Sequence, residues 1–140
     1  MKLATCVLIP VAEYFLSISR RGDNTLWGIP GGKVDKDESC VEAAVRELHE
    51  ETGIVIHHSE LTELFADVCP GDVDFLVTTY LYTGHNINSS TILKPELEFE
   101  LALMSKEDLS NPQISPFAKY NCDVFTALKS LKGDMNAENC

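Results

Sequence analysis

The sequence predicts an α/β fold in which a mixed β-sheet packs between helices. Two observations carry this prediction: short β-rich runs lie on both sides of a central amphipathic helix, and a second amphipathic helix closes the chain. The 140 residues, 44% of them hydrophobic, suffice for one core and contain no internal repeat. We therefore expect a single domain over residues 1–132 and a polar tail over residues 133–140.

Two strand-like runs open the chain, at residues 3–9 and 14–19, and Pro10 between them fits a bend. Residues 20–24 are rich in turn-forming types. Residues 27–32 combine a proline with three glycines, which exclude a regular helix and let the backbone approach a ligand closely. Both segments predict loops that lead into the next element.

Residues 38–51 have the spacing of an amphipathic helix. An apolar stripe recurs at offsets of three, four and seven, formed by Val41, Ala44, Val45 and Leu48. Asp35 or Asp37 is the expected N-cap, and Gly53 suits the left-handed position that often follows a last turn. One face of this helix is therefore committed to a core.

The second half of the chain predicts further strands and a closing helix. The strand-like runs, of which 74–82 is the strongest, lie at residues 54–56, 61–68, 74–82 and 97–104. Residues 84–90 resemble a loop. Apolar residues at helical spacing predict the closing helix at residues 117–131.

The charge balance restricts the class of partner. Eleven basic residues against 22 acidic ones give a formal net charge of −11, which argues against binding to long nucleic acid. No apolar run reaches the roughly 20 residues that span a bilayer. The five cysteines form no C-x-x-C pair, so we expect free thiols in a reducing cytoplasm.

The central helix also carries an acidic face. Glu47, Glu50 and Glu51 cluster on one side of the helix, away from the apolar stripe. Their mutual repulsion would be relieved by a divalent cation, which prefers oxygen ligands. Arg46 lies four residues from both Glu42 and Glu50 and can pair with either.

Two features at the start of the helix complete the pattern. Glu38 is expected to brace the loop or an arginine, with metal ligation as its second role. Gly31 and Gly32 offer backbone groups to a metal or a phosphate. A solvated glutamate-rich face is the ordinary alternative, but it does not explain the joint spacing. A P-loop is excluded, because Lys33 is not followed by Ser or Thr.

Residues 32–54 resemble a complete Nudix box, and residues 27–34 resemble the approach to that box in MutT-type members. The resemblance implies an α/β/α sandwich and a hydrolase that uses Mg²⁺ or Mn²⁺ to cleave a nucleoside diphosphate linked to another group. It implies that Glu47, Glu50 and Glu51 hold metal and that Glu47 is the first candidate for the base. Arg46 would orient Glu47, and the Gly31 carbonyl could complete the metal shell.

Some family members use a carboxylate in a later loop as the base, and Glu96, Glu98 and Glu100 are the candidates here. Solvent-facing charge is the alternative for each of them.

Residues near the glycine loop are candidates for substrate contact. Arg20, Arg21 and Lys33 could bind phosphate, with solvated loop charges as the alternative. Trp27 could stack on a base or anchor a core.

The MutT-type resemblance implies hydrolysis of a (d)NTP to (d)NMP and pyrophosphate. Pro70 lies sixteen residues past Ile54, near the place of a proline typical of ADP-ribose pyrophosphatases, although it also fits an ordinary turn. ADP-ribose or a dinucleotide is therefore the second candidate substrate. A non-catalytic nucleotide sensor and an RNA-decapping enzyme are further alternatives, the latter disfavoured by the charge. The expected partner is a small nucleotide, bound by a monomer or homodimer, with no membrane contact.

Overall fold

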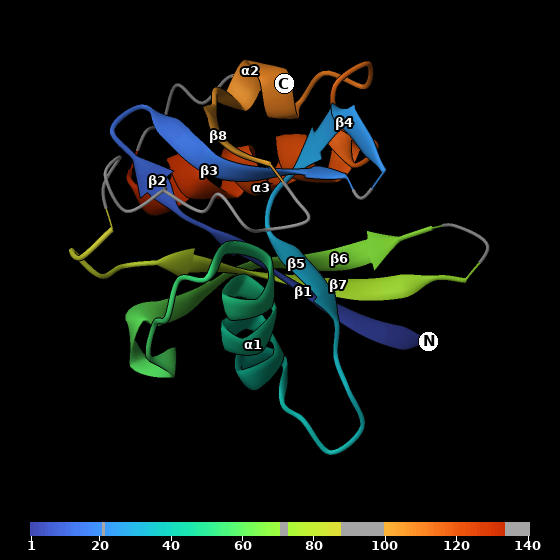
Figure 1. Ribbon diagram of the computed structural model, residues 1–140, viewed down its shortest axis with the longest axis vertical. Coiled ribbons are helices and arrows are strands. Elements are labelled where there is room, and N and C mark those ends of the chain that lie inside the picture. The colour runs from blue at the N-terminus through green and yellow to red at the C-terminus, as the bar shows by residue number, and fades with distance from the viewer. Residues whose placement is uncertain (21, 71–72, 88–99, 134–140) are drawn as a thin grey trace.

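A computed structural model describes residues 1–20, 22–70, 73–87 and 100–133 (Figure 1). Its strands are β1 (Lys2–Leu8), β2 (Pro10–Val11), β3 (Tyr14–Arg20), β4 (Asp23–Gly28), β5 (Gly31–Lys33), β6 (Leu61–Cys69), β7 (Phe75–Tyr82) and β8 (Leu101–Met104). Its helices are α1 (Cys40–Thr52), α2 (Lys106–Leu109) and α3 (Ala118–Leu131), with a 3₁₀ turn, η1, at His58–Glu60.

The strands form two sheets. The first has the order β5-β1-β7-β6, in which β1 and β7 are parallel and the other neighbours are antiparallel. In the second, β3 pairs antiparallel with β2, β4 and β8. The first sheet is therefore mixed, as the sequence predicted.

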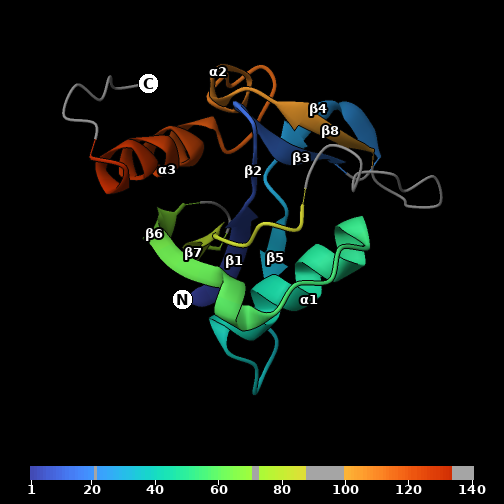
Figure 2. The same cartoon turned by 90° about the vertical axis from the view of Figure 1, so that its left-hand side faces the viewer.

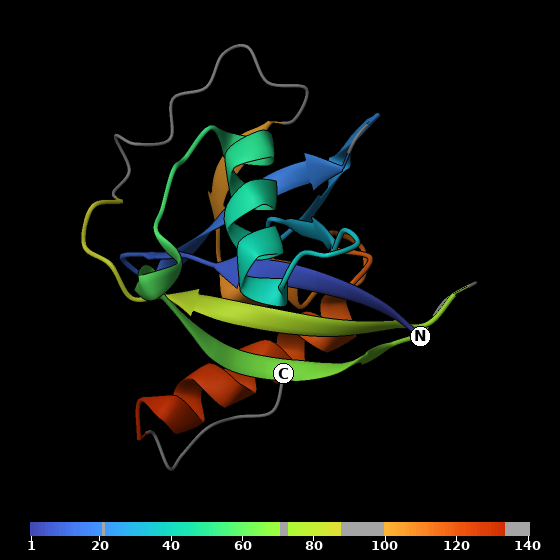
Figure 3. The same cartoon turned by 90° about the horizontal axis from the view of Figure 1, so that it is seen from below.

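The helices α1 and α3 lie on opposite faces of the first sheet (Figure 3). Helix α1 contacts β1 and β5, while α3 contacts β6. Figure 2 shows the same layers from another side. This arrangement is the expected α/β/α sandwich with a mixed β-sheet between helices.

Alternation along β1 divides the core into two halves. Val7 packs with Ala44 and Leu48 on the α1 side, and Leu8 packs with Val124 on the α3 side. The apolar stripe predicted for α1 is thus confirmed, and its opposite face is free for polar side chains.

The ends of α1 are capped by local hydrogen bonds. The Ser39 hydroxyl accepts from the Glu42 N–H, and the Glu42 carboxylate accepts from the Ser39 N–H. The prediction of Asp35 or Asp37 as N-cap is therefore wrong. Asp37 instead occupies a turn with φ of 66°. The C-terminal prediction is confirmed, since Gly53 has φ of 75° and donates to the His49 carbonyl.

The two segments predicted as loops before α1 contain strands. Residues 23–28 form β4, which pairs with β3, and residues 31–33 form β5, which pairs with β1. Gly31 has no side chain, and a Cβ there would meet the Thr5 carbonyl oxygen and lie 2.9 Å from Cys6 Cα. Glycine has a poor intrinsic strand preference, but its lack of a side chain is what lets β5 lie this close to β1.

Elsewhere the predictions and the structure differ less. Residues 54–56 are not a strand, although Ile54 and Ile56 are buried in the core. The short helix α2 was not predicted. The strands expected at 61–68 and 74–82 and the closing helix are confirmed, and residues 101–104 of the last expected strand form β8.

Two further observations concern the cysteines and the helices. The cysteines within the described residues, Cys6, Cys40, Cys69 and Cys122, form no disulfide. No helix in the described part of the chain has the length and apolar content needed to cross a bilayer. The division into a domain over 1–132 and a tail stays a prediction.

Candidate active site

Arg46 is the centre of a carboxylate cluster on the polar face of α1. Its Nη1 donates to Glu47 Oε1 at 3.1 Å and to Glu50 Oε1 at 3.2 Å. Of the two expected partners it therefore uses Glu50, because Glu42 is occupied in the helix cap. Glu47 is the inner member of the cluster, with 16% of its side chain exposed against 56% for Glu50.

Glu38 holds the other edge of the guanidinium. Arg46 Nε donates to Glu38 Oε2 at 2.8 Å, and Arg46 Nη2 donates to Glu38 Oε1 at 3.0 Å. The same Nη2 donates to the Lys33 carbonyl, and Asp35 Oδ2 lies 3.4 Å away. The two hydrogen bonds to Glu38 fix the plane of the guanidinium. Glu38 thus braces an arginine, the first of the two roles expected for it.

The two glycines of β5 contact two different glutamates. The Gly31 N–H donates to Glu51 Oε1 at 2.8 Å. Gly32 faces Glu47, and a Cβ at Gly32 would lie 2.5 and 2.6 Å from the two carboxylate oxygens. Both carboxylates are therefore held between α1 and the strand that borders it.

The electrostatics of this cluster disfavour ionisation of its buried members. Burial is the main cause that raises the pKa of Glu51 to about 8; the Gly31 N–H opposes this rise, and the charges of Glu47 and Glu50 add to it. Burial also raises the pKa of Glu47, against the opposing effect of Arg46. The hydrogen bonds from Arg46 lower the pKa of Glu38, so that Glu38 stays ionised.

The donor set fits a hard divalent cation. Carboxylate oxygens are the ligands that Mg²⁺ and Mn²⁺ prefer, and a cation would offset the cost of ionising Glu47 and Glu51. Among the described residues, no three His, Cys, Asp or Glu side chains form a ready-made cage. Mg²⁺ does not require such a cage, because it is usually held by one or two carboxylates together with water and substrate phosphates.

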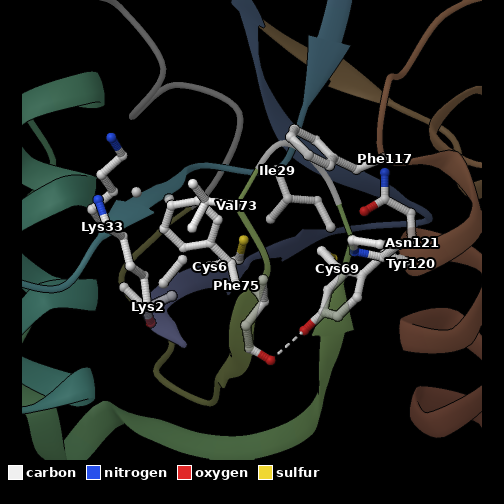
Figure 4. A pocket seen from close by; sticks show the side chains of 16 residues that line it. Lys2, Cys6, Ile29, Lys33, Cys69, Val73, Phe75, Phe117, Tyr120 and Asn121 are labelled. Carbon is white, nitrogen blue, oxygen red and sulfur yellow. Dashed lines mark hydrogen bonds between the residues drawn. The ribbon is translucent and has the colours of Figure 1, made fainter.

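A cavity of about 510 Å³ lies beside the cluster, between the first sheet and the start of α3 (Figure 4). Its lining comes from β1, β5, β6, β7 and α3 and is mainly apolar. Gly31 and Gly32, which contact the two glutamates, are part of this lining. Burial raises the pKa of Cys6, another lining residue, to about 12, and the charge of Glu51 contributes. The cavity therefore adjoins the carboxylate cluster across β5.

The two ends of the cavity differ in chemistry (Figure 4). Lys2 and Lys33 lie at one end, and Phe117, Tyr120 and Asn121 lie at the other. The Asn121 amide donates to the Leu109 carbonyl at 2.8 Å and to Ser115 Oγ at 3.2 Å. Tyr120 Oη donates to the Val77 carbonyl at 3.0 Å. The cavity thus has one cationic end and one aromatic end with a fixed amide.

Only some of the predicted substrate residues line the cavity. Lys33 lines the cavity. Arg20 and Trp27 are both described, on β3 and β4 of the second sheet, and neither lines the cavity. Arg21 lies outside the described residues. Sequence reasoning missed Lys2, which gives no signal because the pairing of β1 with β5 and β7 brings it to this site.

The later-loop carboxylates are placed only in part. Glu96 and Glu98 lie outside the described residues. Glu100 is described and exposed, and its backbone exchanges hydrogen bonds with Ser19 on β3. Its role as a base or ligand stays a prediction.

Comparisons with known proteins point to one family. A family model described as NUDIX domain matches residues 2–122. An uncharacterized Nudix hydrolase of Bacillus subtilis, YvcI, is 31% identical over 98 residues, which are 64% of this chain and 58% of that protein. A MutT-like protein of Streptomyces ambofaciens is 41% identical over 54 residues, which are 39% of this chain and 35% of that protein. The chain therefore spans less than two thirds of the length of these curated relatives.

Solved structures share the fold. The crystal structure of a MutT protein from Methanosarcina mazei has a TM-score of 0.71 and 21% identity, and the match covers 94% of this chain and 95% of that one. This likeness supports the two-sided packing of the first sheet described above.

Proposed function

Because the chain belongs to the Nudix domain family, we propose that it is a Mg²⁺- or Mn²⁺-dependent hydrolase of a diphosphate linkage in a nucleotide. The observation that carries the proposal is the junction at β5. There Gly31 and Gly32 contact Glu51 and Glu47 and also line the cavity. A bound nucleotide would meet the carboxylate cluster at this junction.

The residues of α1 have different roles in the proposed reaction. Glu47, Glu50 and Glu51 would hold the cation, which when bound supplies positive charge to stabilise the phosphate oxygens during hydrolysis. Arg46, held by Glu38, keeps the Glu47 carboxylate against Gly32. Glu47 is the first candidate to accept the proton of the attacking water, and the Gly31 carbonyl is a further candidate ligand.

We take a nucleoside triphosphate, cleaved to the monophosphate and pyrophosphate, as the substrate. Three observations support this choice. The cavity is large enough and apolar enough for a nucleoside, since small-molecule sites commonly occupy 300–1,000 Å³. One end of the cavity carries two lysines, although the chain as a whole is strongly acidic. The similar Streptomyces protein is described as MutT-like.

ADP-ribose or a dinucleotide is the second candidate, and one observation favours it. Pro70, the residue that raised this possibility, lies just past the end of β6 and lines the cavity. A substrate with a second nucleoside or ribose would then contact the part of the cavity that Pro70 lines. A nucleotide sensor without turnover would use the same cavity.

The proposal is tested by a turnover screen in Mg²⁺ and in Mn²⁺. The substrates are standard and oxidised (d)NTPs, ADP-ribose, NADH, dinucleoside polyphosphates and nucleotide sugars, with products identified by ion-exchange chromatography. We expect a (d)NTP to yield the monophosphate and pyrophosphate, and EDTA to stop the reaction. Turnover of ADP-ribose alone would favour the second candidate, and no turnover of any substrate would refute the hydrolase proposal.

A further inference from the structure

We propose that Lys2, acting with Lys33, binds the terminal phosphates of a nucleoside triphosphate and thereby favours it over nucleotides that lack these phosphates. The inference rests on the proposed function, because it concerns which diphosphate the same site takes. Lys2 is the new element, since only Lys33 was a candidate from the sequence.

The strand register places both lysines on the cavity face of the first sheet. Lys33 on β5 lies opposite Ala4 on β1, and Lys2 precedes Ala4 by two residues, so the two lysines share a face. Lys2 in turn lies opposite Phe75 on β7. The Lys33 ammonium is 5.9 Å from the centre of the Phe75 ring. Both lysines and Phe75 therefore line this end of the cavity (Figure 4).

The charges of the two lysines are available to a ligand. No aspartate or glutamate is among the described residues that line the cavity. Within the described part of the chain, neither lysine forms an ion pair with a carboxylate, in contrast to Lys119, which pairs with Asp123 at 2.7 Å. A cationic end in a chain of net charge −11 favours a polyanion at that place.

The order of residues from Ile29 to the end of β5 gives the bound nucleotide a direction. Ile29, which lies near Phe117 in Figure 4, precedes Gly31, and Gly31 precedes Lys33. Gly31 is the residue that contacts Glu51. A nucleotide with its base at the aromatic end and its reacting phosphate near Gly31 extends its remaining phosphates toward the lysines. Gly31 and Lys33 are two strand residues apart, about 7 Å, a span suited to one or two further phosphate groups.

The test is a binding measurement that does not require turnover. Isothermal titration calorimetry compares α,β-methylene-dGTP, which keeps three phosphates and resists cleavage, with dGMP, which keeps one. The variants are Lys2→Gln, the charge-preserving Lys2→Arg, and Lys36→Gln as a control that removes the same charge from an exposed position outside the cavity lining. Any affinity tag is placed at the C-terminus, because Lys2 is close to the N-terminus.

Lys2→Gln should weaken binding of the triphosphate analogue by roughly three- to tenfold and leave dGMP binding unchanged. Lys2→Arg should retain the wild-type difference between the two ligands, and Lys36→Gln should change neither. Equal losses for both ligands, no loss for either, or the same loss in Lys36→Gln would overturn the inference. Turnover in the screen without this binding difference would overturn the inference alone, whereas the binding difference without turnover would overturn the hydrolase proposal alone.

Discussion

Gly32→Ala should impair the site while the fold remains intact. The added methyl carbon would lie 2.5 and 2.6 Å from the two oxygens of Glu47, whereas close C···O contacts in proteins are about 3.3 Å or more. The Glu47 carboxylate must therefore move by about 1 Å to restore that contact distance. Because the obstacle is the end of a side chain and not the backbone, we expect a stability change within about 1 kcal/mol.

The rate should respond far more than the stability. A displacement of about 1 Å in a positioned group can cost about 100-fold in rate, and the moved carboxylate also leaves its contact with Arg46. The assay is kcat in saturating Mg²⁺ on the best substrate of the screen, together with thermal unfolding followed by circular dichroism.

Gly31→Ala is the matched comparison. There the methyl group would meet the Thr5 carbonyl and lie 2.9 Å from Cys6 Cα, both in the backbone of β1. This strand cannot rotate away, so overpacking should cost about 1–3 kcal/mol or more. Wild-type kcat in Gly32→Ala would refute the role of Glu47 placement. Wild-type stability in Gly31→Ala would refute the close packing of β5 on β1.

Three further predictions follow from the same contacts. In EDTA the free energy of unfolding should fall as the pH rises from about 5 to 8. The pKa of Glu51 is raised from 4.5 to about 8 in the folded protein, so over this range the folded protein keeps a proton that the unfolded chain has lost. In urea unfolding, Glu51→Gln should lack this pH dependence, and an equal pH dependence in the variant would contradict the assignment of the effect to Glu51. Glu38→Gln should lower kcat by roughly tenfold, because Arg46 is then held less firmly. Glu42→Gln removes the same charge and can keep its helix cap, so it should not lower kcat. Equal effects of the two variants in steady-state assays would contradict the role of Glu38 in holding Arg46. Ser39→Ala should lower stability by about 1 kcal/mol in thermal unfolding, and an unchanged melting temperature would contradict the cap.

The acidic helix was predictable because its information is local. Four apolar positions at helical spacing and three glutamates on the other side of the same helix need no distant partner to be recognised. Gly53 was predictable for the same reason, since a left-handed residue after a helix is a local requirement. The cap was assigned wrongly because Ser39 and two aspartates compete at neighbouring positions, and the reciprocal contact with Glu42 decides between them.

Strand β5 and the cavity depend on residues far apart in the chain. A Gly-Gly-Lys segment has no strand preference of its own and becomes a strand only where β1 lies beside it. The cavity brings Lys2 from the start of the chain to Asn121 on α3, and no local pattern connects these residues. Trp27 lies on β4 of the second sheet, outside the cavity lining, and its role in base stacking stays a prediction.

Mn²⁺ binding to the metal-free protein, followed by electron paramagnetic resonance, tests the central claim that the carboxylate face of α1 holds the divalent cation. Glu51→Gln keeps an oxygen that can accept from the Gly31 N–H, so it removes charge with little change in shape. Glu42→Gln removes the same charge from the helix cap. We predict that Glu51→Gln weakens Mn²⁺ binding by at least about tenfold and that Glu42→Gln binds as the wild type does. Equal Mn²⁺ affinity in wild type and Glu51→Gln would contradict the account.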